Sequence, residues 1–400
     1  MLPKVRGGDP SSVWRTRNVW TFSLASLFSD WGHELVTALL PGFFTLLGAP
    51  VIALGLTEGI SNLAQAWAGL WGGQENDRQV RRHAIIIAGY ILTGVKALIA
   101  VVTWWPWVVL LRTVGWLGRG ARGPIRDAYI ADEVSPEHVG KAYGLREAFD
   151  TAGAVLGPLT AAFLITFWTP RTLIAFSAIP AVLTVVVILK LQKMPGLAMA
   201  ATRPESSRVP IPWSLSFKKY RIATAVFTAG YLAPTFFILR VWNSGVILGS
   251  LSAHMIALFL YTLHNIAYAA SAYPVGRLAD RTASHALLVT GYSLWAAAVI
   301  GFVFDQSSIV GWVVLFVATG LATGIIEVGQ KMVTVRLVET SVRGRGLGQI
   351  AAVRGMGQLA AGVIMGILWT LVNPESGFSV EAGLACLGLI LVFRVGQTDT

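Results

Sequence analysis

Two carboxylates stand four residues apart in the first long apolar stretch of the chain. Asp30 and Glu34 both lie within residues 18–41, and this spacing places them on one face of a helix. Two such groups repel each other when both are ionised, so one of them readily holds a proton. This chemistry suits a reversible proton carrier, although each carboxylate could instead pair with an arginine of a later stretch. His33 points to another side of the helix and is expected to pack rather than to bind a ligand.

The fourth apolar stretch, residues 106–130, carries a row of arginines. Their spacings of seven, three and four residues place them near one stripe of a helix: Arg112, Arg119, Arg122 and Arg126. Such a stripe could attract anions or neutralise the acidic pair of the first stretch. The last three arginines could instead form a basic cluster that contacts lipid headgroups, whereas Arg112 lies deep enough to have a functional role.

Further charged residues lie in apolar stretches of both halves of the sequence. The candidate cavity for protons and substrate includes, besides the residues above, Asp127, Arg146, Asp150, Glu327, Lys331 and Arg354. A charge at the centre of a bilayer costs about 2.5–3.5 kcal/mol even on lenient scales, so these groups are expected to face water, a substrate or one another. Asp150 and Arg354 occupy corresponding places in the two halves. Asp127 and Lys331 do the same, and each pair could meet across a cleft or be satisfied locally.

The composition indicates a membrane protein. Of the 400 residues, 54% are hydrophobic and only 13% are charged, and the mean hydropathy is +0.64; a soluble protein usually carries about 25% charged residues. The net charge of +11 comes from basic residues scattered between apolar stretches, so nucleic-acid binding is not expected. The single cysteine, Cys386, excludes an intrachain disulfide and a zinc site of the CxxC type, and no cofactor or resident metal is expected.

Twelve stretches are long and apolar enough to cross a bilayer, which takes about 20 residues per helix. They are residues 18–41, 50–71, 83–104, 106–130, 141–168, 171–190, 220–241, 251–274, 284–304, 308–333, 346–372 and 378–394. With the N-terminus inside, Lys and Arg gather on the inner side, and the outer loops hold only Arg171. The positive-inside rule therefore predicts a multi-pass protein of the inner (cytoplasmic) membrane with both termini cytoplasmic. The basic N-terminal segment lacks the pattern of a removable signal peptide.

Two short motifs recur at nearly the same distance along the chain. The letters GQENDR (73–78) return as GRLADR (276–281), 203 residues later, and GKAYG (140–144) returns as GRGLG (344–348), 204 residues later. Two matches at nearly one offset indicate duplicated halves.

The predicted fold is an all-α membrane protein of twelve transmembrane helices in two pseudo-symmetric six-helix bundles. Its parts are a cytoplasmic N-terminal segment (1–17), an N-terminal bundle (18–190), a cytoplasmic linker (191–219) and a C-terminal bundle with a short cytoplasmic tail (220–400).

The motif that follows the second stretch resembles the signature of the major facilitator superfamily, G-x-x-x-D-R-x-G-R-R. The matching residues are Gly73, Asp77, Arg78, Arg81 and Arg82, with Val80 in place of the second glycine. The fifth stretch is similar to the G-x-x-x-G-P motif of efflux antiporters through Gly153, Gly157 and Pro158, and small residues of this kind permit close helix packing. The resemblance extends to a bacterial branch of efflux permeases, and it implies export by alternating access.

The duplicated motif could act as a conformational latch. At a helix end, an aspartate can accept hydrogen bonds from a neighbouring helix N-terminus and pair with an arginine. The residues expected in this latch are Gly73, Asp77, Arg78, Arg81, Arg82, Gly276, Asp280 and Arg281. Release of such contacts would help the halves rock against each other. Alternatively, the arginines only fix the topology.

The leading hypothesis is a monomeric secondary transporter, not an enzyme, that exports a small organic solute in exchange for protons. One alternative is a divalent-cation exporter that uses Asp30, Glu34 and His33, and another is an organic-anion transporter that uses the arginines of the fourth stretch. A multi-span membrane enzyme is a distant alternative, because the long linker holds no recognisable catalytic set.

Overall fold

The computed structural model describes residues 16–78, 81–193, 213–281, 284–304, 308–339 and 342–396. These residues are almost entirely helical and contain no β-strand, apart from one isolated bridge between Leu248 and Leu251. The prediction of an all-α protein is therefore confirmed.

The first group of helices, called the N-terminal group, covers every apolar stretch predicted before the linker. It consists of α1 (Arg17–Leu46), α2 (Val51–Arg78), α3 (Arg82–Gly94) with its 3-10 continuation η2 (Val95–Val101), α4 (Trp105–Glu133), the short η3 (Pro136–His138), α5 (Val139–Leu164), α6 (Pro170–Phe176) and α7 (Ala178–Ile188).

The C-terminal group covers the stretches predicted after the linker. It consists of α8 (Leu215–Thr228), α9 (Pro234–Trp242), α10 (Ala253–Arg281), α11 (Ser284–Val303), α12 (Ile309–Leu337), α13 (Arg343–Leu371) and α14 (Pro374–Gly396). The break between α8 and α9 has a local cause: Pro234 at the first position of α9 has no N–H to continue a helix and favours a new start.

Seven helical stretches of the described residues are long and apolar enough to cross a membrane. The helices α1, α2, α4 and α5 are not among these seven, although each is at least 26 residues long. They are the helices that carry most of the charged candidate residues, which lower their hydropathy. The count of twelve spans therefore stays a prediction.

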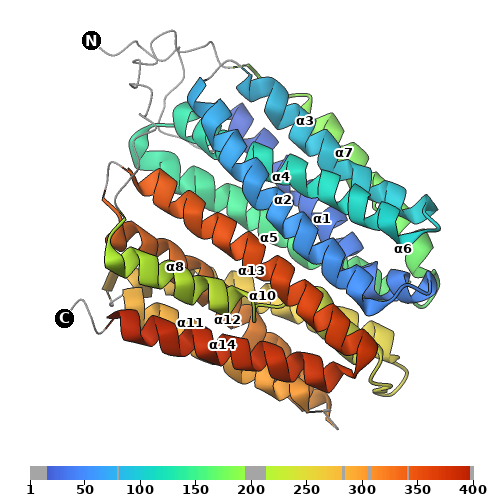
Figure 1. Cartoon of the computed structure of the whole chain (residues 1–400). Helices are drawn as coiled ribbons and strands as arrows, with labels where there is room; N and C mark the ends of the chain where they lie inside the picture. Colours follow the sequence, from blue (N-terminus) through green and yellow to red (C-terminus); the bar gives the residue numbers. More distant parts are fainter. Residues whose placement is uncertain are drawn as a thin grey trace, which may run out of the picture.

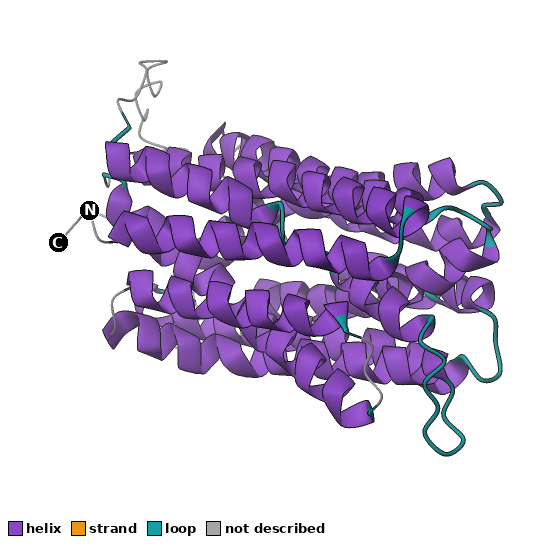
Figure 2. Cartoon of the chain, turned by 60° about the horizontal axis from the view of Figure 1, so that its bottom comes forward, coloured by secondary structure: helices purple, strands orange, loops and turns teal. Residues whose placement is uncertain are grey.

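The helices lie side by side along one direction (Figures 1 and 2). In Figure 1 the N-terminal group fills the upper part of the molecule and the C-terminal group the lower part. The helix α1 begins and α14 ends at the same end of the molecule, which we call the terminal end; the other end is the opposite end.

Close glycine contacts join the two groups along α2 and α13. The backbones meet where Gly55 faces Gly362, and a Cβ atom on Gly59 would lie 2.6 Å from the Cα of Leu359. Side chains at these positions would force the helices apart, so the small residues permit this packing. At the opposite end, Gly42 of α1 lies against the indole ring of Trp242 of α9.

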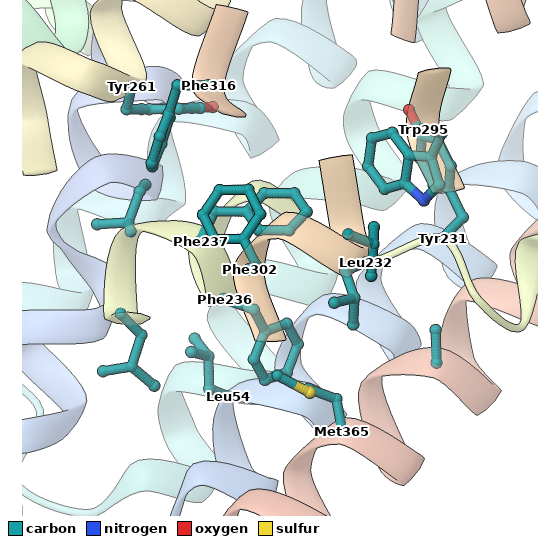
Figure 3. Packing of buried hydrophobic residues seen from close by; sticks show 14 of the residues in the cluster. Leu54, Tyr231, Leu232, Phe236, Phe237, Tyr261, Trp295, Phe302, Phe316 and Met365 are labelled. Carbon is teal, nitrogen blue, oxygen red and sulfur yellow. The ribbon is translucent and has the colours of Figure 1, made fainter. Parts of the chain in front are cut away.

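An aromatic core holds the C-terminal group together around the α8–α9 break (Figure 3). The rings of Phe237 and Phe302 stack with centroids 4.5 Å apart, and those of Tyr231 and Trp295 stack at 4.0 Å. The indole N–H of Trp295 donates to the carbonyl oxygen of Gly230 at 3.0 Å, which satisfies a backbone group that the break leaves without a helical partner.

The glycine contact between α2 and α13 predicts a position-specific effect on stability. A Gly55→Ala substitution should destabilise the protein by about 1–3 kcal/mol, because the new methyl group overlaps the backbone of Gly362. The matched control is Gly69→Ala in the same helix, where a Cβ atom would only reach ordinary contact at 3.8 Å. Thermal unfolding of both variants in detergent tests this, and equal Tm values would contradict the packing.

Candidate functional site

Arg112 of α4 is the most deeply buried charge of the site, with an exposed fraction of 1%. Its Nη2 atom donates to both carboxylate oxygens of Glu58 in α2, at 2.9 and 3.1 Å, and its Nη1 atom donates to the hydroxyl of Thr37 at 3.3 Å. The partner of Arg112 is thus Glu58 rather than the acidic pair of α1. Because Glu58 occupies the guanidinium group, Arg112 is not open to an anion in this conformation.

Asp30 pairs with another arginine of α4. Both carboxylate oxygens accept from Arg119, and the Nη2–Oδ2 distance is 3.0 Å. The Asp30 side chain is buried, whereas that of Arg119 keeps an exposed fraction of 23%. The alternative in which the carboxylate pairs with a fourth-stretch arginine therefore describes Asp30 in this structure.

Asp150 of α5 is a second carboxylate that interacts with Asp30 where α5 crosses α1. The approach is possible because α5 has glycines where it crosses α1: a Cβ atom on Gly153 would lie 3.1 Å from the Cβ of Asp30, and one on Gly157 would lie 2.8 Å from that of Glu34. Asp150 also lies 3.5 Å from Nη1 of Arg146, one turn earlier in its own helix. Two carboxylates can form a hydrogen bond only when one of them is protonated.

Glu34 lies on the same side of α1 as Asp30 but reaches the other group of helices. Its Oε2 atom accepts from the hydroxyl of Tyr261 in α10 at 2.6 Å. Nearby, the amide of Asn265 in α10 donates to the carbonyl oxygen of Ala154 in α5 at 2.8 Å. The predicted acidic pair is therefore divided between two tasks, because Asp30 is satisfied within the N-terminal group and Glu34 contacts the C-terminal group.

His33 and Arg122 are both buried and have defined partners. The Nδ1 atom of His33 meets the ammonium group of Lys96 in η2, and its ring packs edge-on against Trp116 at 4.8 Å. Arg122 donates to Ser29 at 3.0 Å and lies 3.8 Å above the ring of Tyr90. A role for Arg122 in contacting lipid headgroups does not fit this position.

Toward the terminal end, the charged residues pair within their own group. Arg126 lies 3.0 Å from Asp127, and Arg146 contacts Glu147. In the C-terminal group, Glu327 accepts from Tyr268 at 2.8 Å and lies 3.9 Å from Arg354, while Lys331 is exposed. Two pairs were predicted to meet across the halves: Asp150 with Arg354, and Asp127 with Lys331. Neither pair forms in this conformation, because Asp150, Arg354 and Asp127 have partners in their own group and Lys331 is exposed.

The structure describes only part of the predicted latch. The side chains of Asp77, Arg78, Asp280 and Arg281 lie outside the described residues. Of the others, Gly73 and Gly276 have open space around them and Arg81 is exposed.

Arg82, a further member of that set, makes contacts that do join helices. It donates to Asp132 at the end of α4 at 2.7 Å and to the carbonyl oxygen of Asn76 in α2 at 3.1 Å.

In the part of the chain that the structure describes, no group of three or more His, Cys, Asp or Glu side chains is arranged to hold a metal ion. The position of His33 explains this for the first helix, because its imidazole meets an ammonium group and not the two carboxylates together. The arrangement does not favour the divalent-cation hypothesis.

Sequence reasoning missed two partners. Glu58 stood in an apolar stretch, and that position alone was a signal of function. Tyr261 gave no signal, since a tyrosine in an apolar helix usually only packs.

Comparison with known proteins identifies the family. The family model of the Major Facilitator Superfamily matches residues 22–249 and 235–399. An MFS-type transporter of Methanocaldococcus jannaschii is 27% identical over 389 residues, which cover 94% of this chain and 95% of the relative. The multidrug resistance protein MdtH of Cronobacter sakazakii is 31% identical over 126 residues, 31% of each chain. The crystal structure of the nucleoside transporter NupG has a TM-score of 0.76 at 13% identity and covers 96% of this chain and 99% of its own.

The family match identifies a multi-span integral membrane transporter rather than an enzyme. The chain belongs to the Major Facilitator Superfamily.

The buried Arg112–Glu58 pair predicts strong coupling between the two residues. Replacing either one by leucine should destabilise the protein by about 3–5 kcal/mol, because the remaining charge stays buried without its partner. The double variant should recover most of this loss. A double-mutant cycle of thermal unfolding in detergent measures the coupling, and additive effects of the two substitutions would refute the pair.

The Glu34–Tyr261 hydrogen bond predicts a shift in the equilibrium between conformations. A Tyr261→Phe substitution removes the hydrogen bond to Glu34, which joins the two groups. The fraction of molecules that are open at the opposite end should then rise about tenfold. Spin labels at Leu47 and Ile247, in a background with Cys386 replaced by serine, report the separation of that end. Tyr268→Phe is the matched control, because its bond to Glu327 stays within one group. An unchanged distance distribution in Tyr261→Phe would contradict the prediction.

Proposed function

We propose that this protein is a proton-coupled exporter of a small organic solute that works by alternating access. The observation that carries the proposal is the carboxylate pair Asp30 and Asp150, which meet between α1 and α5 beside Arg119 and Arg146. With one proton, the two carboxylates hydrogen-bond to each other. When both carboxylates are ionised, they repel each other. This repulsion favours a state in which they move apart or pair more closely with Arg119 and Arg146.

The environment of this pair supports a coupling role. Asp30 is buried, but Arg119 and Asp150 have side chains that are 23% and 19% exposed. The partial exposure of Asp150 gives a proton a way to reach the pair. Because Glu34 lies one turn beyond Asp30 and holds Tyr261 of the other group, a movement of α1 that follows protonation would reach the contact between the groups.

The two groups form the moving parts of this proposal. We assign residues 18–190 and 220–400 to two six-helix halves related by pseudo-symmetry, joined by a cytoplasmic linker, 191–219. The repeated motifs and the positive-inside pattern support this assignment, with the terminal end on the cytoplasmic side of the inner membrane.

The contacts between the groups favour a state open toward the cytoplasm. At the opposite end, Phe163 of α5 packs edge-on against Phe259 of α10 at 5.7 Å, and α1 meets α9 where Gly42 touches Trp242. Toward the terminal end, the side chains of Asp127 and Glu327 are 47% and 34% exposed. Charged side chains at this depth are expected to line water rather than lipid.

The efflux direction rests on similarity. The fifth-helix residues Gly153, Gly157 and Pro158 resemble an antiporter motif, and MdtH, a multidrug resistance protein, matches about a third of the chain. The organic-anion alternative is less favoured, because Glu58 already neutralises Arg112. Asp77, Arg78, Asp280 and Arg281 stay proposed as latch residues.

The test is transport by purified protein in proteoliposomes with an imposed pH gradient. A panel of labelled amphiphilic organic solutes, organic anions and Mn²⁺ serves as substrates. We expect gradient-driven flux of an organic solute in the native protein. In Asp30→Asn and Asp150→Asn this flux should fall by at least about tenfold, the loss expected from one ionisable group, whereas solute exchange without a gradient persists.

Glu137→Gln, at an exposed carboxylate outside the site, is the control and should transport normally. Gradient dependence that is unchanged in both aspartate variants and in the double variant would remove this pair from the mechanism. Gradient-driven flux of Mn²⁺ alone would favour the cation alternative.

A further inference from the structure

A small pocket lies inside the N-terminal group, beside Asp30. Helices α1, α3 with η2, and α7 surround it, and its polar lining consists of Ser29, His33, Tyr90, Thr93, Lys96, Ser177 and Thr184. It has room for a single particle of about the size of a water molecule. No carboxylate belongs to the lining.

The ammonium group of Lys96 is the charge that dominates this pocket. Lys96 has an exposed fraction of 3%, and within the described residues its hydrogen-bond partner is Nδ1 of His33. An ammonium group has three N–H donors, so two of them remain for a ligand. None of the described carboxylates forms an ion pair with Lys96, so its ammonium form needs an anion beside it and would otherwise give up a proton.

The surrounding charges increase the demand for an anion. Three guanidinium groups add positive potential at Lys96, whereas Asp30 opposes them. Two of these, Arg112 and Arg119, already have carboxylate partners. The third, Arg122, contacts hydroxyl and carbonyl oxygens and an aromatic ring, but no described carboxylate.

The hydroxyl groups of the lining divide into two kinds. Those of Thr93, Ser177 and Thr184 donate to backbone carbonyl oxygens of their own helices at 2.6–2.8 Å. The hydroxyl of Ser29 accepts from Arg122, so its hydrogen is still available. Tyr90 has only a long contact of 3.5 Å with Ser26. The free donors of the pocket are therefore those of Lys96, Ser29 and Tyr90, whereas Ser177 and Thr184 present oxygen lone pairs to it.

We propose that this pocket binds one small inorganic anion of the size of chloride, held by Lys96 and by the hydroxyl groups of Ser29 and Tyr90. The bound anion neutralises Lys96 and ties α1 to α3. Neither Asp30 nor Asp150 lines the pocket, and the anion site would exist whether or not the protein is coupled to protons.

The test compares chloride with gluconate at constant ionic strength, using the purified full-length protein in detergent. We expect chloride to raise Tm saturably by about 2–5 °C, as a ligand specific for the folded state does. Equilibrium dialysis with radioactive chloride should show about one bound ion per chain, the number that a pocket of this size can hold.

Three variants define the site. Lys96→Met should abolish both the Tm rise and chloride binding, whereas Lys190→Met, the same change at an exposed lysine, should leave both unchanged. Tyr90→Phe keeps the ring above Arg122 and removes only the hydroxyl, so it should weaken chloride binding about tenfold. If Lys96→Met does not fold, Tyr90→Phe decides the question. Equal Tm in chloride and gluconate, with no bound radioactive chloride, would mean that the pocket holds only water and would overturn the proposal.

Discussion

A buried charge in an apolar helix needs a partner, and the N-terminal group is organised by that need. Four helices meet through ion pairs or charge-assisted hydrogen bonds spread along α4: Arg112 joins α4 to α2, Arg119 joins α4 to α1, and Arg122 joins α4 to α3. Each bond fixes the rotation of α4 about its own axis, because all three arginines project from one helix. Because an unpaired buried charge is costly, the three arginines favour one arrangement of α4 against its neighbours.

The same constraint explains how the two groups of helices are connected. Most buried charges are satisfied within one group of helices, as with Glu327 and Tyr268 in the C-terminal group. Glu34 is an exception, because its hydrogen-bond donor, Tyr261, belongs to the other group. The other contacts between the groups carry no charge: small residues meet along α2 and α13, the rings of Phe163 and Phe259 pack together, and Asn265 donates to the carbonyl oxygen of Ala154. A change at α1 can therefore alter the balance between conformations.

The sequence was sufficient to predict the helical fold, the family and the residues that carry charge in apolar stretches. Helix ends were less predictable: α4 continues to Glu133 and α12 to Leu337, because a helix can extend beyond the apolar layer into water. The ion-pair and hydrogen-bond partners of these charged residues could not be predicted from the sequence. Arg112 selects Glu58 and not Asp30, since the choice depends on helix rotation and on which helices are neighbours. Gly153 was recognised as a packing residue, but only the structure shows that it brings Asp150 to Asp30.

The central claim is that Asp30 and Asp150 share a proton that is taken up and released during transport. Infrared difference spectroscopy of the purified protein during a pH titration detects the carbonyl stretch of a protonated carboxyl group directly. The account predicts a carboxyl band that titrates in the native protein and is lost in Asp150→Asn. A spectrum in which the titrating carboxyl bands are identical in the native protein and in Asp150→Asn would contradict it.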